Sequence, residues 1–315
     1  MDTAARLANC GGKYCMIIDF FRSRNVLKKG QSIVIDSSNA PNLNWPVSQA
    51  CTQAQVAEPA YDYWCSQIAE PPRVHRKQWE FVYILQALAR YGMLAPGLKG
   101  LGFGVGGEPL ASVFAARGVS VLATELEPSR AAEEGWIETS QHAASKQELN
   151  SRGLCSQELF DKKVDFRFMD MNFIDDDLND QFDFCWSACA LEHLGSIKNG
   201  LDFIVNSLDT LKPGGIAVHT TELNCSSDVE TIESGPTVLF RQSDFIALAQ
   251  RLTADGYELM MNFNLGQQLL DNYVDVPPYT QHKHLKLMFD NWITTSFGLI
   301  IRKPLHKISI EAKPS

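Results

Sequence analysis

LKGLGFGVGGEPLASVFAARGVSVLATELE, at residues 98–127, reads as a strand, a glycine-rich turn, a helix and a second strand that ends in an acidic residue. Glycine lets a backbone turn tightly and approach a ligand without a Cβ in the way. Pro109 suits the first turn of a helix, and Gly118 suits the position just after its end. The second strand, at 119–124, is apolar and rich in β-branched residues, as in a buried parallel sheet. The stretch predicts the first strand–helix–strand unit of an α/β fold.

Two acidic residues of this stretch indicate what it binds. Glu125 follows Gly104 by 21 residues, and a carboxylate at about that distance beyond a glycine turn can accept both hydroxyls of a ribose. Glu108 stands at the N-terminus of the predicted helix. A dinucleotide would place its pyrophosphate there, because the helix dipole favours anions, and Glu108 would repel it. S-adenosylmethionine carries a sulfonium and an ammonium, so the residues favour this adenosine cofactor over a dinucleotide.

Composition narrows the choice of partners. The chain has 315 residues, a hydrophobic content of 45% and a net charge of −9. This acidic balance argues against broad nucleic-acid binding and against an anionic membrane surface. No apolar run reaches the roughly 18 residues of a membrane span, and the N-terminus does not resemble a signal peptide. We expect a cytoplasmic protein that binds neither nucleic acid nor membrane.

The eight cysteines are scattered and form no CxxC pair. We expect them to be reduced and mostly buried, although Cys185 and Cys189 are candidates for redox chemistry.

Strands and helices alternate from residue 97 onward, which predicts a parallel sheet with helices on both faces. The expected strands are 99–103, 119–124, 164–169, 182–187, 216–221, 257–263 and 295–302. We expect Ser129 and Ser243 to cap two of the helices. Residues 1–75 are predicted to form an ordered extension over the acceptor, 76–305 the main domain and 306–315 a tail. The segment 265–294, long for a loop, is predicted to be a lid or substrate loop.

Four motifs in this order resemble those of class I S-adenosylmethionine-dependent methyltransferases. They are FRFMDMN at 166–172, FDFCWSACALEHL at 182–194, LKPGG at 211–215 and SFGLIIRK at 296–303. They resemble the family's third strand, its fourth strand with the segment after it, the turn before its fifth strand, and its antiparallel seventh strand. Together with the glycine turn, the resemblance covers about residues 78–303. It implies a Rossmann-like fold with a seven-stranded, mostly parallel sheet whose last strand is antiparallel.

Several segments narrow the resemblance to a bacterial group that methylates glycans and small molecules. They are HRKQWEFVYI, LGFGVGGEPL, DFCWSACALEHLG and AVHTTE.

The resemblance also implies positions for the cofactor. The residues implied to contact it are Gly102, Phe103, Gly104 and Gly106 in the turn, Glu125 at the ribose, Asp170 and Met171 at the adenine, and Ser187 with Ala188 beside the methyl group. One position departs from the family pattern. Gly100 stands where the family commonly has an acid, two residues before the first glycine of the turn, so Glu108 becomes the candidate for the cofactor's ammonium.

Methyl transfer to a hydroxyl needs a desolvated site, close approach and a base. His193 is the first candidate, because it follows the fourth predicted strand and an imidazole has an ordinary pKa of about 6.5. Alternatively, Glu192 and His193 only support the loop through hydrogen bonds, or contact the acceptor without proton transfer. His219 is a further catalytic candidate at the end of the fifth predicted strand. Glu222 lies on the opposite side of that strand and is a candidate for the acceptor.

Further candidates come from the loop and the first predicted helix. Tyr279, His282 and His284 would bind a polar acceptor if 265–294 covers the site. The basic run 75–77 would bind an anion or form salt bridges at a helix start. A metal would require residues such as His193, His219, Glu222 and Asp275 to meet, and no ligand spacing supports that, so we expect none.

The sequence therefore predicts a methyltransferase that acts on an oxygen of a sugar or other small polar metabolite, with a homodimer left open. One alternative is a nicotinamide-dependent oxidoreductase, for which a catalytic Tyr-x-x-x-Lys pair is expected. Another is a non-catalytic binding partner with the same fold, which the missing acid at Gly100 favours.

Overall fold

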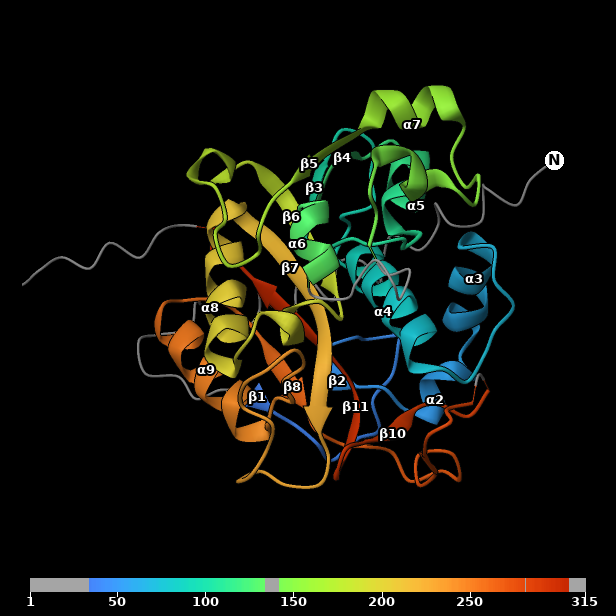
Figure 1. Ribbon diagram of the computed structural model, residues 1–315, viewed down its shortest axis with the longest axis vertical. Helices are drawn as coiled ribbons and strands as arrows, with labels where there is room; N and C mark the ends of the chain where they lie inside the picture. Colours follow the sequence, from blue (N-terminus) through green and yellow to red (C-terminus); the bar gives the residue numbers. More distant parts are fainter. Residues whose placement is uncertain (1–33, 134–141, 281, 306–315) are drawn as a thin grey trace, which may run out of the picture.

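Eleven strands form one mixed sheet with helices on both faces (Figure 1). The computed structural model describes residues 34–133, 142–280 and 282–305. The strands are β1 (Val34–Ile35), β2 (Ser48–Ala50), β3 (Lys99–Gly102), β4 (Ser120–Glu125), β5 (Val164–Phe168), β6 (Phe182–Ala188), β7 (Leu211–Asn224), β8 (Met260–Asn262), β9 (Val274–Asp275), β10 (Lys286–Phe289) and β11 (Trp292–Arg302). The α-helices are α2 (Gln53–Val56), α3 (Pro59–Gln67), α4 (Arg76–Arg90), α5 (Leu110–Ala116), α6 (Pro128–Glu133), α7 (Gln157–Lys163), α8 (Ile197–Ser207) and α9 (Gln242–Ala254).

All seven strands expected from the sequence form. Their order is β5-β4-β3-β6-β7-β11, with β8 further along the same edge. Neighbours from β5 to β7 are parallel, whereas β11 runs antiparallel to β7. The expected α/β fold, a mostly parallel Rossmann-like sheet with an antiparallel last strand, is confirmed, and the sheet has four more strands than the seven expected.

Alternation along the strands divides the apolar core into two layers. On β6, Phe184 and Trp186 pack in the layer beneath α4 and α5, while Cys185 between them packs beneath α8 and α9. Successive side chains of a strand point to opposite faces, so one continuous apolar strand serves both layers.

Part of the predicted N-terminal extension belongs to the sheet. β2 lies between β11 and β8, pairing antiparallel with the former and parallel with the latter. Tyr61 and Trp64 of α3 are buried against α4, as their aromatic character requires. Residues 1–33 and the predicted tail 306–315 lie outside the described residues.

Part of the segment 265–294, predicted as a long loop, forms β9 and β10 and joins the sheet. β10 pairs antiparallel with β11 through Phe289 and Trp292, and the two-residue turn between them contains Asp290 at φ +51°. A hairpin turn of this length needs a residue with positive φ, and Asp tolerates it. The segment is attached to the start of α4, because the His284 N–H donates to the Val74 carbonyl and the Arg76 N–H donates to that of His284.

Two predicted helix caps are also corrected. Ser129 lies inside α6, and α9 begins one residue before Ser243, with Arg241 at the N-cap and its N–H donating to Asp244. Of the eight cysteines, the six in the described residues are free thiols. None of the described helices has the length and apolar character needed to cross a membrane.

Gly298 tests the packing of α4 on the sheet. A Cβ at Gly298 would lie 2.1 Å from Cε1 of Tyr83, whose hydroxyl donates to the Val47 carbonyl at 2.6 Å. Overpacking of this kind costs about 1–3 kcal/mol, so Gly298→Ala is expected to lower the free energy of unfolding by that amount in urea denaturation. Gly107→Ala is the control, because nothing lies within 4 Å of its Cβ position. Equal stability of the two variants would contradict this packing.

Candidate functional site

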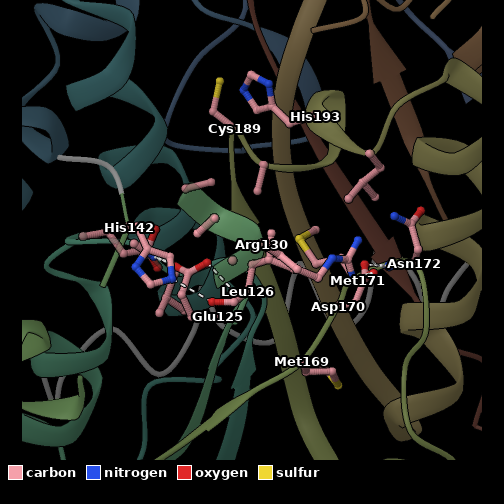
Figure 2. A pocket seen from close by; sticks show the side chains of 18 of the residues that line it. Glu125, Leu126, Arg130, His142, Met169, Asp170, Met171, Asn172, Cys189 and His193 are labelled. Atoms are coloured by element: carbon pink, nitrogen blue, oxygen red, sulfur yellow. Dashed lines mark hydrogen bonds and ion pairs between the residues drawn. The ribbon is translucent and has the colours of Figure 1, made fainter. Parts of the chain in front are cut away.

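A pocket of about 760 Å³ opens at the carboxyl ends of the parallel strands (Figure 2). This is where ligands bind in open α/β sheets. Most of its lining comes from the segments that follow β3, β4, β5 and β6. The lining residues that the sequence singled out are Gly104, Gly106, Glu108, Glu125, Asp170, Met171, Ala188 and His193.

The glycine turn is locked to the end of β4. Gly104 and Gly106 have φ of +55° and +49°, a region that strongly favours glycine. The Gly106 N–H donates to Glu125 Oε2 at 2.6 Å, and the Leu126 N–H donates to Oε1 at 2.7 Å. Glu125 is only 7% exposed, and burial raises the pKa of its carboxyl. The turn and the acid thus form one rigid wall of the pocket.

The segment after β5 forms another part of the wall. Asp170 accepts a hydrogen bond from the Asn172 N–H at 2.8 Å and forms an ion pair with Arg130 of α6. Met171 contacts the glycine turn, because its sulfur would lie 3.0 Å from a Cβ on Gly104. His142 also lines the pocket, and its Nε2 lies 2.7 Å from the Leu126 carbonyl. Sequence reasoning missed Arg130 and His142, which no motif marked.

Glu108 is a buried carboxyl in the same pocket. Its Oε1 accepts a hydrogen bond from Trp186 Nε1 at 2.5 Å, and the residue is only 6% exposed. Burial raises the pKa of Glu108 to about 8, despite the hydrogen bond from Trp186 and the positive charge of Lys77. Near neutral pH, a ligand in the pocket would therefore decide whether the Glu108 carboxyl is protonated or ionised.

His193 and Cys189 occupy a different end of the pocket from Glu125 and Asp170 (Figure 2). His193 ends the short 3₁₀ helix η4 (Leu191–His193) that follows β6. Its Nδ1 lies 2.8 Å from the Pro236 carbonyl. A carbonyl only accepts, so Nδ1 carries the proton and Nε2 has the lone pair. The tautomer suits a base that accepts a proton at Nε2.

Glu192 lies near Nε2 of this imidazole. Its Oε2 accepts a hydrogen bond from Thr221 at 3.0 Å, while Oε1 has no hydrogen-bond partner among the described residues and lies 3.8 Å from His193 Nε2. Glu192 is fully buried, and burial raises the pKa of its carboxyl. A carboxyl in this position would stabilise positive charge on His193 without touching a ligand.

A network of ion pairs lies next to Cys189, and its Lys77 lines the pocket. Arg76 pairs with Glu222, and Lys77 pairs with Glu80 at 2.9 Å. Burial is the largest single influence on the pKa of Glu222 and would raise it, but the charge of and hydrogen bond from Arg76, the hydrogen bond from Thr294 and the charge of Lys77 together lower that pKa. The basic run 75–77 is therefore accounted for mainly by salt bridges at the start of α4. His75 accepts a hydrogen bond from the Lys77 N–H as its N-cap.

Three residues of this region could also be considered as metal ligands. Cys189, Glu192 and Glu222 place one potential ligand atom each within 4.8 Å of one another. Arg76 and Lys77 already supply positive charge there, so a divalent cation would have to displace a buried guanidinium from Glu222. The four residues considered from the sequence do not meet, since Asp275 pairs with His284 at 2.6 Å and His219 lies in the core.

Four predicted site residues are buried away from the pocket. Gly102 packs against Trp186, whose Cζ2 would lie 2.4 Å from a Cβ there, and Phe103 packs edge-on against Phe203. Ser187 and His219 are completely buried and hydrogen-bond to each other at 2.9 Å. Burial lowers the pKa of His219 to about 3. None of the four lines the pocket, so the structure does not support direct ligand contact or proton transfer by their side chains.

The predicted acceptor residues also lie elsewhere. Glu222 is paired with Arg76, and His284 is bound to Asp275 and stacked on His75 at 4.7 Å between ring centroids. The Tyr279 hydroxyl donates to the Met288 carbonyl, and His282 is exposed. Tyr279 and Lys283 have the Tyr-x-x-x-Lys spacing, but no described residue of 265–294 or 34–75 lines the pocket. These segments do not cover the site in this structure.

The wall beside His193 comes instead from Gly195, which follows η4, and from the loop after β7. Gly195 and Gly235, both with positive φ, and Pro236 line the pocket there. The Gly235 N–H donates to the Gly195 carbonyl at 3.0 Å, and the Val238 N–H donates to that of Glu192 at 2.9 Å. The sequence contained a signal for this turn in SGP at 234–236, a typical loop composition that had no assigned role.

Removing Arg76 tests the buried network. Arg76→Met leaves the Glu222 charge without its partner, which costs about 3–5 kcal/mol when the pair is buried. We expect a loss of that size in urea denaturation at pH 7. The stabilisation by Glu222 is complete above the unfolded pKa of a glutamate and is lost as pH falls, because its folded pKa is lowered. The double variant Arg76→Met with Glu222→Leu should recover most of the loss. A single variant as stable as wild type would contradict the pair.

Comparisons with known proteins give only weak similarities. No protein-family model and no curated protein matches the chain. A provisionally assigned sarcosine dimethylglycine methyltransferase from Galdieria sulphuraria is similar at 12% identity and a TM-score of 0.44, over 79% of this chain and 99% of that one. Haemonchus contortus phosphoethanolamine N-methyltransferase 2, solved with S-adenosyl-L-methionine, has 17% sequence identity and a TM-score of 0.39. The match covers 64% of this chain and 41% of that one. The [4+2]-cyclase SpnF has 18% sequence identity and a TM-score of 0.41, and the match covers 67% of this chain and 75% of that one. These values establish neither a family nor a reaction for the chain.

Proposed function

We propose that the chain is a class I S-adenosylmethionine-dependent methyltransferase that acts on an oxygen of a small polar acceptor. The observation that carries this proposal is the Glu125 carboxyl. It ends β4, faces the pocket and is fixed by the Gly106 and Leu126 N–H groups. A carboxylate in this position recognises the two hydroxyls of a ribose.

The rest of the pocket fits this cofactor. Asp170, Met171 and Asn172 would line the adenine, with an apolar side chain beside polar groups. Glu108 suits the positively charged end of the cofactor and would repel the pyrophosphate of a dinucleotide. S-adenosylmethionine, when bound, supplies an electrophilic methyl group. The residues of the chain would bind and orient the cofactor and would exclude water from the pocket.

His193 is proposed as the base for the acceptor. Its Nδ1–H is held by the Pro236 carbonyl, so Nε2 would take the proton of the acceptor hydroxyl as that oxygen attacks the methyl carbon. Glu192 would stabilise the resulting imidazolium from 3.8 Å. Its role is to position and support His193, because it is fully buried.

The choice of an oxygen acceptor, and of a sugar or similar metabolite, rests on this base. A hydroxyl must lose its proton to become a good nucleophile, and an imidazole can accept one near neutral pH. The pocket volume of about 760 Å³ leaves room for a small molecule beside a cofactor. A screen of sugars, nucleotide sugars, phenols and small amines for release of S-adenosylhomocysteine would identify the acceptor.

Glu125→Ala is expected to weaken S-adenosylmethionine binding about 100-fold, because each hydrogen bond to a charged group contributes about 1.5–3 kcal/mol. Isothermal titration calorimetry would measure this, with NAD as the competing ligand. Glu127→Ala is the matched control, since Glu127 is an exposed acid two residues further on. Wild-type protein that binds NAD but not S-adenosylmethionine would sink the proposed function.

His193→Ala is expected to lower kcat by about 10² to 10⁴, the usual contribution of a general base, and to leave the Kd of S-adenosylmethionine nearly unchanged. Single-turnover kinetics and calorimetry would separate the two quantities once an acceptor is known. His282→Ala should behave like wild type, because His282 is exposed and outside the pocket lining. If His193→Ala lost cofactor affinity and kcat equally, its assignment as the base would be wrong.

A further inference from the structure

Among the buried acids that line the pocket, Glu108 has the fewest hydrogen bonds and no ion pair with the described residues. Trp186 donates to Oε1 at 2.5 Å, and no described residue forms a hydrogen bond with Oε2. The residue lines the pocket and is 6% exposed. A buried carboxylate with one neutral hydrogen bond is costly unless a cation joins it.

The charged groups around Glu108 do not provide that cation. Lys77 of α4 is the nearest source of positive charge, but its ammonium lies 2.9 Å from Glu80. Glu80 on α4 and Glu125 on β4 are acids that add negative charge on the same side. Without a cation beside it, Glu108 therefore holds a proton well above the usual pH range of a glutamate, with a pKa of about 8.

The packing of β3 explains why the acid comes from position 108. A Cβ on Gly100 would lie 2.4 Å from Cζ of Phe184, and a Cβ on Gly102 would lie 2.4 Å from Trp186. No side chain fits at either position while these rings fill the core. The same Trp186 that requires Gly102 presents its indole N–H to Glu108. From β3, a carboxyl therefore reaches the pocket only through the turn beyond the strand.

We propose that Glu108 binds the ammonium of the cofactor's methionine part and releases a proton when it does so. The inference rests on the proposed function. Without the ammonium beside it, the carboxyl is mostly protonated at pH 7. When the ammonium arrives, the O–H bond of Glu108 breaks, the proton passes to solvent or buffer, and the carboxylate pairs with the cation while Trp186 keeps its hydrogen bond. Cofactor binding is thus coupled to pH at this residue.

Three ligands separate this role from general damage to the pocket. S-adenosylmethionine and S-adenosylhomocysteine both carry the ammonium, whereas 5′-methylthioadenosine has the adenosine part alone. Glu108→Gln preserves the shape and the acceptor for Trp186. It should weaken the first two ligands roughly 10-fold, the usual scale for a charge-assisted hydrogen bond, and leave the third unchanged. Glu125→Ala should weaken all three, because the ribose is common to them.

Proton release gives a second readout that needs no variant. Calorimetry at pH 7.0 in two buffers of different ionisation enthalpy should show release of about one proton per S-adenosylmethionine by wild type, because a group with a pKa of about 8 is mostly protonated there. Between pH 6.0 and 7.0, where an α-amine stays mostly protonated, the affinity should therefore rise with pH. Glu108→Gln and 5′-methylthioadenosine should both abolish the release.

The outcomes distinguish this inference from the proposed function. If wild type binds none of the three ligands, the proposed function fails. If wild type binds them but Glu108→Gln keeps full affinity and full proton release, only the role of Glu108 fails. A loss for S-adenosylmethionine alone would also overturn the assignment, because it would place Glu108 at the sulfonium instead of the ammonium.

Discussion

The packing of Trp186 and Phe184 on β6 against the glycines of β3 is the constraint on which the pocket depends. Gly100 and Gly102 leave no side chain on this face, so the two rings fill the space beside Phe114 of α5. β3 and β6 are neighbours, and their parallel pairing brings both carboxyl ends to one edge of the sheet. The turn after β3 and the segment after β6 consequently face each other across the pocket. A larger residue on β3 would move both.

This packing places the turn after β3 and the turn after β6 at two ends of the pocket. The chain after β3 turns at Gly104 and Gly106 and is fixed by Glu125 from the next strand. The chain after β6 turns at Cys189, a non-glycine residue with φ +54°, and presents His193. Each turn is fixed by hydrogen bonds to a neighbouring strand, since the Cys189 N–H donates to the Thr220 carbonyl at 3.0 Å. The sheet edge therefore positions the backbone at both ends, and the loop after β7 fixes the His193 side chain through the Pro236 carbonyl.

Features that depend on local sequence pattern could be predicted from the sequence. Features that depend on contacts between residues distant in the chain could not. The strands and the placement of Gly104, Gly106 and Glu125 follow from periodicity and turn chemistry within 30 residues. β2 was missed, because a three-residue strand has no measurable period and its place between β11 and β8 is fixed only by tertiary pairing. His219 was assigned to the pocket because it ends an apolar run. β7 instead continues to Asn224, which leaves His219 inside the core.

The distribution of charge in the pocket argues for a direction of binding. Glu80 and Glu222 lie outside the lining and are already neutralised by Lys77 and Arg76. Within the lining, Glu108 and Glu125 have hydrogen bonds from N–H groups but no ion pair among the described residues. A ligand with a positive end and a ribose gains most by placing both against these two acids, because Asp170, the remaining acid of the described lining, already pairs with Arg130. The end beside His193 then remains for an acceptor that is not required to carry charge.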